Sequence, residues 1–188
     1  MDILQIQSNP NRQFLNIIEK RIRKNLRSKD ILHKDQTIYV IDQLTIFFLK
    51  RIVTLPVNIV QLSKKELNIK EYNCSIFSNK EIRVFIKKMK KNEILFLPLL
   101  LDDYCALFLQ SHFANQKIYQ QIKKQHLHSL FETITYEEIK VITERFNLKV
   151  PFNREDDLYS FLDALEARFH GTKHALYNSL QFYKKNIM

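Results

Sequence analysis

The chain has one glycine, Gly171, in 188 residues. Glycine-rich phosphate loops such as G-x-x-x-x-G-K-[ST] and G-x-G-x-x-G need several glycines, because their backbone approaches phosphate closely or takes positive φ angles. The single glycine therefore excludes both kinds of nucleotide loop.

Cysteine is almost as scarce, with two residues in the whole sequence. Cys74 and Cys105 are far apart and form no C-x-x-C pair, which excludes a disulfide framework and a zinc ribbon. We expect both to be core thiols in a reducing compartment.

Long apolar runs and a targeting segment are also missing. The first residues, MDILQIQSNPNR, lack a basic region followed by an apolar run, so no signal peptide is predicted. The longest apolar runs, at 94–101 and 45–49, are far shorter than the ~20 residues that span a bilayer. We therefore expect a soluble, cytoplasmic protein with no membrane contact.

What the chain does have is a large apolar content and positive charge. Its residues are 45% hydrophobic and 27% charged, which is typical of a folded domain rather than a disordered chain. The formal net charge is +10. Residues 135–188 hold eight acidic and eight basic groups, so residues 1–134 carry all of the excess.

Two clusters contain most of these cations, each with one glutamate. The first contains Arg12, Lys20, Arg21, Arg23, Lys24, Arg27 and Lys29, and the second contains Lys80, Arg83, Lys87, Lys88, Lys90 and Lys91. Cations on the polar face of a helix release counterions from a polyanion, so we expect both clusters to bind RNA phosphate. The alternative is that they are merely solvated helix faces.

Apolar periodicity predicts the order of the elements. Amphipathic helices are expected over about 11–27 and after Asp42, over 79–91 behind a Ser78–Glu81 capping box, and after Asp102-Asp103. Buried strands are expected at 37–41 and 94–97, with a further possible strand at 57–62.

The remainder is predicted to be helical. A capping box of Thr135 and Glu138 opens one helix, and an apolar stripe from Leu158 to Phe169 marks another. Gly171 suits the end of that helix, and Thr172 is expected to cap the last one. We divide the chain into an α/β portion with a partial sheet (1–114), a polar helical linker (115–134) and a helical C-terminal lobe (135–188).

Residues with catalytic or metal-binding chemistry do not assemble into a motif. His126 and His128 lie in a polar stretch, while Gly171 interrupts the pair His170 and His174, so no metal site is predicted. Asp102-Asp103 could hold magnesium or act in acid–base chemistry, but a helix N-terminus explains the pair better.

Three segments resemble the N-type PP-loop ATPases that thiolate tRNA. The run NRQFLNIIEKRIR precedes IYVIDQLTIFFLKRIV, in which Asp42 is similar to the acidic residue of a Gly-His/Asp motif whose glycine is missing. The segment ILFLPLLLDDYCALF resembles an Arg-Pro-Leu-Arg motif. It keeps Pro98, Leu99 and Asp102, with leucine at both arginine positions. The closing segment, DLYSFLDALEARFHGTKHALYNSLQFYKK, with Gly171 and Thr172 at its turn, resembles the family's last two helices.

The resemblance is greatest to the cytoplasmic tRNA 2-thiolation protein 2 family, and covers the C-terminal part of a full member. It implies a Rossmann-like PP-loop sheet (adenine nucleotide alpha hydrolase-like) and no cofactor, since the nucleotide loop and cysteine motifs have no counterpart. It also implies a non-catalytic subunit. The partners would be tRNA and an active PP-loop thiolase in a heterodimer, with sulfur for the wobble uridine coming from a thiocarboxylated ubiquitin-related modifier.

Two other interpretations stay open at the level of sequence. The chain could be a helical interaction module whose charge keeps it soluble, or a general RNA-binding subunit without a role in thiolation. An autonomous enzyme is the least favoured, because no active site is evident in the sequence.

Overall fold

The computed structural model describes residues 10–63, 65–69, 72–73, 76, 79–113, 126–148, 152, 154 and 156–187. Its centre is a parallel sheet of four strands in the order β2-β1-β3-β4. The strands are β1 (Thr37–Val40), β2 (Asn58–Gln61), β3 (Glu93–Phe96) and β4 (Leu127–His128). All three pairings are parallel, which confirms an α/β fold and the three strands that the sequence predicted.

The two central strands are apolar because both faces of the sheet are covered. Along β1, Ile38 and Val40 belong to one hydrophobic cluster, while Ile41 just beyond the strand belongs to the other. Along β3, Ile94 and Phe96 alternate with Leu95 in the same way. A parallel sheet with two covered faces reads as a continuous apolar run, and this is why 37–41 and 94–97 were recognisable.

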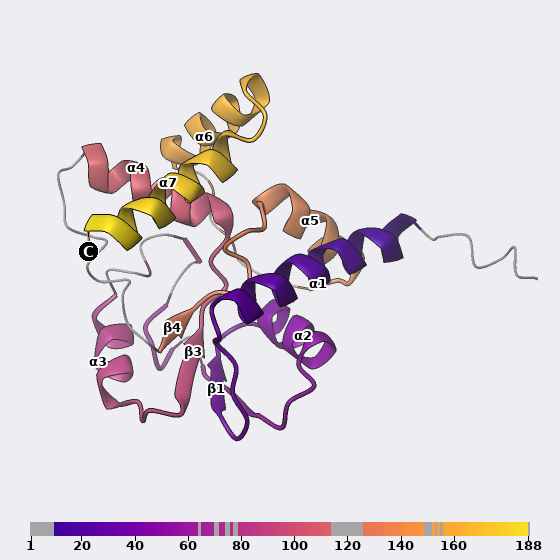
Figure 1. The fold of residues 1–188 in the computed structure, drawn as a ribbon, viewed down its shortest axis with the longest axis vertical. Coiled ribbons are helices and arrows are strands. Elements are labelled where there is room, and N and C mark those ends of the chain that lie inside the picture. The colour runs from indigo at the N-terminus through magenta and orange to yellow at the C-terminus, as the bar shows by residue number, and fades with distance from the viewer. Residues whose placement is uncertain are drawn as a thin grey trace, which may run out of the picture.

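Seven helices surround the sheet in the described part of the chain (Figure 1). They are α1 (Pro10–Ser28), α2 (Gln43–Ile52), α3 (Lys80–Lys88), α4 (Leu101–Phe113), α5 (Tyr136–Arg145), α6 (Asp157–Arg168) and α7 (Thr172–Ile187). Helices α1, α2 and α5 pack in one cluster, whereas α3, α4, α6 and α7 pack in the other. Within the described ranges, no helix has both the length and the apolar character needed to cross a bilayer.

Local capping explains where several helices begin. The Asp42 side chain accepts the Thr45 N–H ahead of α2, and Thr135 forms the expected capping box with Glu138 ahead of α5. The predicted cap of α3 was wrong by one residue: Asn79 caps this helix by accepting the Ile82 N–H, and Ser78 lies outside the described residues.

The predicted helical linker over 115–134 was wrong for the part that the structure describes. Residues 127–128 form β4, and backbone N–H groups of Leu95 and Leu97 donate to the carbonyls of His126 and His128. Residues 114–125 lie outside the described ranges. A strand of two residues in a Gln-, Lys- and His-rich stretch has no periodicity of its own, so pairing with β3 decides its conformation.

The predicted C-terminal lobe is helical, but its helices lie in different places. Helix α5 packs with α1 and α2 through Ile139 and Ile142, whereas α6 and α7 pack against α4. Figure 1 shows α4, α6 and α7 together in its upper part and α5 beside α1. The predicted apolar stripe from Leu158 to Phe169 is buried only in part, because Phe161 and Phe169 are 47% and 58% exposed.

The turn between α6 and α7 depends on Gly171, as the sequence predicted. This residue has a φ of +87°, a region that side chains disfavour. Thr172 does not cap α7: its hydroxyl donates to the Phe169 carbonyl, and the Glu166 carboxylate accepts the N–H groups of Gly171 and Lys173 instead.

We predict that Gly171→Ala lowers the free energy of unfolding by about 1 kcal/mol, because alanine pays the left-handed backbone penalty. A Cβ at this position meets no atom within 4 Å, so the cost is conformational rather than steric. Gly171→Asn is the control, since asparagine tolerates this conformation and should cost less. Urea unfolding checks both variants, and equal stability of the alanine variant and the wild type would contradict the prediction.

Candidate functional site

In this fold, a ligand site is expected at the carboxyl edge of the sheet between β1 and β3. Strand β2 lies on one side of β1 and β3 on the other, so the chain reverses its direction of winding there. Open α/β sheets bind ligands in the crevice at this switch point. Of the residues that carried the family resemblance, Asp42 follows β1, while Pro98, Leu99 and Asp102 follow β3, so four of them reach this edge.

The crevice next to β1 is filled by the chain itself. Asp42 is 4% exposed, and its carboxylate accepts the Thr45 N–H at 2.7 Å. Tyr72 is fully buried, and its hydroxyl donates to the Ile41 carbonyl at 2.9 Å. Burial, and then the Asp42 charge, raise the pKa of Tyr72, so its hydroxyl stays protonated as a donor. Leu97 and Leu99 belong to the same hydrophobic cluster as Tyr72.

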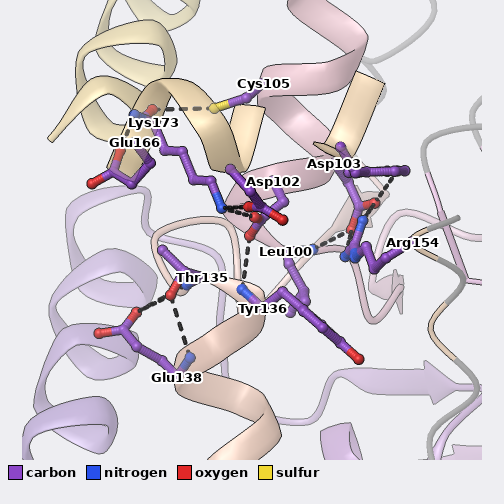
Figure 2. A network of polar contacts seen from close by, with 12 residues as sticks. Leu100, Asp102, Asp103, Cys105, Thr135, Tyr136, Glu138, Arg154, Glu166 and Lys173 are labelled. Atoms are coloured by element: carbon purple, nitrogen blue, oxygen red, sulfur yellow. Dashed lines mark hydrogen bonds and ion pairs between the residues drawn. The ribbon is translucent and has the colours of Figure 1, made fainter. Parts of the chain in front are cut away.

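Asp102 links three helices below the surface. One carboxylate oxygen accepts the Lys173 ammonium at 2.5 Å, and the other accepts the backbone N–H of Tyr136 at 2.8 Å (Figure 2). Lys173 also pairs with Asp163 at 2.5 Å. Burial lowers the pKa of Lys173, but the Asp102 charge, the hydrogen bonds to Asp102 and Asp163 and the Asp163 charge together outweigh it, so the pKa of Lys173 is raised. The cation on α7 is thereby held against the start of α4 and of α5.

The neighbouring Asp103 makes a second buried ion pair. Arg154 donates to both of its carboxylate oxygens, at 2.5 and 3.1 Å, and the Tyr159 hydroxyl donates at 2.7 Å. The Leu100 N–H donates to the same carboxylate. The guanidinium also lies 4.3 Å from the centre of the Tyr159 ring. Two parallel donors and a ring face fix an arginine more firmly than a lysine could be fixed.

Two further carboxylates act in the same way. Glu166 binds the first turn of α7. Burial alone would raise the pKa of Glu166, but the hydrogen bonds that it accepts from the N–H groups of Lys173 and Gly171 contribute to a lowered pKa. Glu132 is buried. Its carboxylate accepts hydrogen bonds from Asn25 and Tyr177 and forms an ion pair with Lys29.

For Glu132, burial opposes ionisation. The Lys29 charge and the hydrogen bonds of its partners overcome that effect and lower its pKa. This carboxylate therefore stabilises the fold above its ordinary pKa, and the stabilisation is lost as the pH falls through the lowered value.

The four helices α2, α4, α5 and α7 thus begin at carboxylates of the same chain. A free helix N-terminus attracts phosphate because its N–H groups and its dipole are unpaired. Here some of those groups already have acceptors: Asp42 accepts the Thr45 N–H, Asp102 the Tyr136 N–H and Glu166 the Lys173 N–H. A nucleotide phosphate next to β1 would also meet Asp42 and the packed side chains of Tyr72 and Leu99. The residues at the switch point do not fit a nucleotide.

The first basic cluster divides into inward and outward cations. Arg21 donates to Glu138 and to the Thr133 carbonyl, and Arg23 donates to the Arg51 carbonyl and pairs with Glu19. These two arginines hold α1 against the rest of the protein. Four others are exposed and have no ion-pair partner among the described residues: Arg12, Lys20, Lys24 and Arg27.

The second basic cluster lies on the other side of the sheet. Helix α3 packs through Ile82 and Ile86 into the cluster opposite to that of α1, and Figure 1 shows the two helices well apart. The exposed cations here are Lys80, Lys87, Lys88, Lys90 and Lys91, whereas Arg83 is partly buried. The structure therefore does not bring the two predicted clusters together.

The histidines give no metal centre in the described part of the chain. His126 contacts the Glu93 carbonyl through Nδ1 at 2.7 Å, and His128 lies near the Phe96 ring. No group of three or more His, Cys, Asp and Glu residues suited to a metal ion occurs among the described residues. Asp102 and Asp103 use their oxygens on protein donors instead.

Comparison with known proteins supports the fold. No protein-family model and no curated protein gives a significant match to the chain. A solved structure does: the U34-tRNA thiolase NcsA from Methanococcus maripaludis with its [4Fe-4S] cluster. The TM-score is 0.62 at 14% sequence identity, over 95% of this chain and 81% of that one. The fold of this protein is therefore similar to that of a tRNA thiolase, as the sequence segments had suggested.

An iron–sulfur cluster does not fit the residues of this chain. Such clusters are held by cysteine thiolates, and this sequence has two cysteines. Cys105 is fully buried, its thiol donates to the Lys173 carbonyl, and burial raises its pKa. Cys74 lies outside the described residues.

Sequence reasoning missed the partners of the buried carboxylates. No motif or spacing in the sequence marks Lys173, Arg154 or Glu132 as a member of a buried ion pair. One signal was present for Lys173: it precedes Tyr177 by four residues and Leu180 by seven, so it lies on the buried face of α7. A charged residue on an apolar face needs a buried partner.

We predict that Arg154→Met lowers the free energy of unfolding by about 3–5 kcal/mol, because it leaves Asp103 as a buried charge without its counterion. The double variant Asp103→Asn/Arg154→Met should cost less than the sum of the single variants, since it removes both charges. Lys140→Met on the exposed face of α5 is the control, with an expected change within about 0.5 kcal/mol. Additive costs in urea unfolding would contradict the coupling.

Proposed function

We propose that this chain is a tRNA-binding, non-catalytic subunit in the 2-thiolation of wobble uridine (U34), in the manner of the cytoplasmic tRNA 2-thiolation protein 2 family. Two observations together carry the proposal. The fold of this chain is similar to that of a tRNA thiolase, and side chains of this chain fill its own switch point. The chain would act in the cytoplasm as a heterodimer with an active PP-loop thiolase. Sulfur from a ubiquitin-related carrier would reach that partner.

The face that we assign to RNA is the outward side of α1. Arg12, Lys20, Lys24 and Arg27 are exposed along it, and Arg12 and Arg27 are separated by roughly 22 Å of helix at 1.5 Å per residue. Lys50 at the end of α2 is exposed as well. A row of unpaired cations of this length suits the phosphate backbone of a nucleic acid, where each contact releases counterions.

The cations of α3 are a secondary contact in this proposal. Lys80, Arg83, Lys87, Lys88, Lys90 and Lys91 were expected to bind RNA together with the first cluster. Because they lie beyond the opposite face of the sheet, we assign them to a different stretch of RNA from that contacted by α1. Lys87 and Lys88 also complement the negative end of their own helix, which accounts for part of their presence.

The packed carboxyl edge supports the proposal of a non-catalytic role. Activation of uridine by a nucleotide would need a phosphate site. The positions that could offer one carry Asp42, Asp102 and Asp103, each already hydrogen-bonded to backbone N–H groups of this chain. The chemistry would therefore lie in the partner, and this chain would contribute surface for the tRNA.

A general RNA-binding subunit is the second candidate, because phosphate contacts alone carry no sequence information. The described part of the basic α1 face contains no exposed aromatic side chain that could stack on a base. If this candidate is correct, affinity will be the same for tRNA and for an unstructured RNA of equal length.

We predict that Arg12→Glu/Lys20→Glu/Lys24→Glu weakens tRNA binding by about tenfold or more and flattens its dependence on salt by about two to three units of slope. Fluorescence anisotropy with a labelled tRNA at several salt concentrations measures both. Arg21 and Arg23 are left in place, since changing them would break contacts within the protein.

The matched control is Lys87→Glu/Lys88→Glu/Lys91→Glu, which changes the net charge equally on the opposite side of the sheet. We expect a loss of affinity within about threefold for this variant, because it touches only the secondary contact. An equal loss from both triple variants would refute the α1 face, and an unchanged salt slope in the first would refute its contact with phosphate.

We also predict that loss of the protein abolishes 2-thiolation of wobble uridine in the cells that encode it. Mass spectrometry of tRNA nucleosides measures the modification directly. Wild-type protein should restore it, and the Arg12, Lys20 and Lys24 triple variant should not. Normal thiolation without the protein would exclude a role in this modification, whatever its affinity for tRNA.

A further inference from the structure

A groove of about 300 Å³ lies away from the carboxyl edge, between the ends of α1 and α2. Its floor is formed by Leu26, Ile31 and Ile52, which belong to the hydrophobic cluster beneath α1. Leu32 and Val53 form its walls, together with Leu55, which is 43% exposed. An apolar hollow that reaches the surface beside an exposed leucine is typical of a binding surface for an apolar side chain.

The rim of the groove is cationic. Arg23 and Arg27 line it, Lys24 is exposed between them in the chain, and Lys50 and Arg51 are exposed directly before the lining residue Ile52. The guanidinium of Arg23 is held in place by the Arg51 carbonyl and Glu19. Asp30 is the one acidic residue among those that line the groove. The rim is therefore positive and partly preorganised for carboxylates.

We propose that this groove binds a protein segment in which a bulky apolar residue is flanked by acidic residues. The apolar side chain would enter the groove between Leu32 and Leu55, and the flanking carboxylates would pair with Arg23 and Arg27. The proposal shares Arg27 with the outward row of α1, but it does not depend on tRNA binding, because the apolar residue would bind to the aliphatic lining of the groove.

Protein fits this groove better than RNA does. The described lining is aliphatic, and recognition of an unpaired base needs aromatic or guanidinium planes on which the base can stack. A second copy of this chain is disfavoured as the occupant, because two chains of net charge +10 would approach with their basic α1 faces close together.

The experiment uses random 12-residue peptides displayed on phage and selected on the full chain. We expect enriched peptides that combine a Leu, Ile, Met or Phe with neighbouring Asp or Glu. Leu55→Asp, which places a charge in the groove, and Thr54→Trp, which fills it, should each recover these peptides at least about tenfold less well. Both positions are exposed, so the variants should fold, and circular dichroism checks this.

Each other outcome overturns the proposal. Enriched peptides without acidic residues, or equal recovery by the variants, would mean that the groove is not the site. Displacement of the selected peptide by tRNA, with weaker tRNA binding by Leu55→Asp, would assign the groove to RNA. Self-association of the wild type in sedimentation, lost in Leu55→Asp, would assign it to a second copy. A chain that does not bind tRNA can still recover the selected peptides. Failure of tRNA binding and failure of peptide binding are therefore distinguishable.

Discussion

The protein depends on one constraint: the N–H groups at the start of a helix need an acceptor, and here the acceptors are carboxylates of the same chain. Asp42, Asp103 and Glu166 serve α2, α4 and α7. Asp102 accepts a hydrogen bond from the first N–H of α5, and it also forms an ion pair with Lys173. The bonds of Asp102, Asp103 and Glu166 join α4, α5, α6 and α7 into one network, whereas that of Asp42 is local to α2. They also occupy the positions at which other α/β proteins receive phosphate.

Positive charge is used in two different ways on the two sides of this network. Buried or half-buried cations such as Arg154, Lys173 and Arg21 neutralise carboxylates inside the protein. Exposed cations on α1 and at the end of α3 pair with no carboxylate among the described residues, and they contribute to the basic surface. Net charge by itself does not separate the two groups, although only the second is able to meet a polyanion. The distinction requires the partners of each side chain.

The sequence predicted the features that local interactions determine. The strands at 37–41 and 94–97 are continuous apolar runs, and the capping box at Thr135 and the turn at Gly171 depend on neighbours within a few residues. Strand β4 was missed because two residues carry no pattern. The exposure of Phe161 was missed because helical spacing identifies apolar residues without saying which of them a neighbouring helix covers.

The candidate site was predictable only in outline. The positions of Asp42 and Asp102 after the strands were visible, and so was the absence of a glycine loop. The cations that pair with Asp102 and Asp103 were not, because Lys173 is 71 residues from Asp102 and Arg154 is 51 residues from Asp103. The same limit applies to the basic clusters, whose separation by the sheet follows from topology and not from spacing along the chain.

The contacts of α7 bear on how the protein folds. Tyr177 meets Lys29 across 148 residues, and Lys173 meets Asp102 across 71. Pairings this distant close large loops, which slows folding compared with helical proteins of local contacts. Until α7 docks, Asp102 and Glu132 lack cations or hydrogen bonds that stabilise them in the interior. The docking of α7 therefore completes the interior with contacts to residues as distant in the sequence as Lys29.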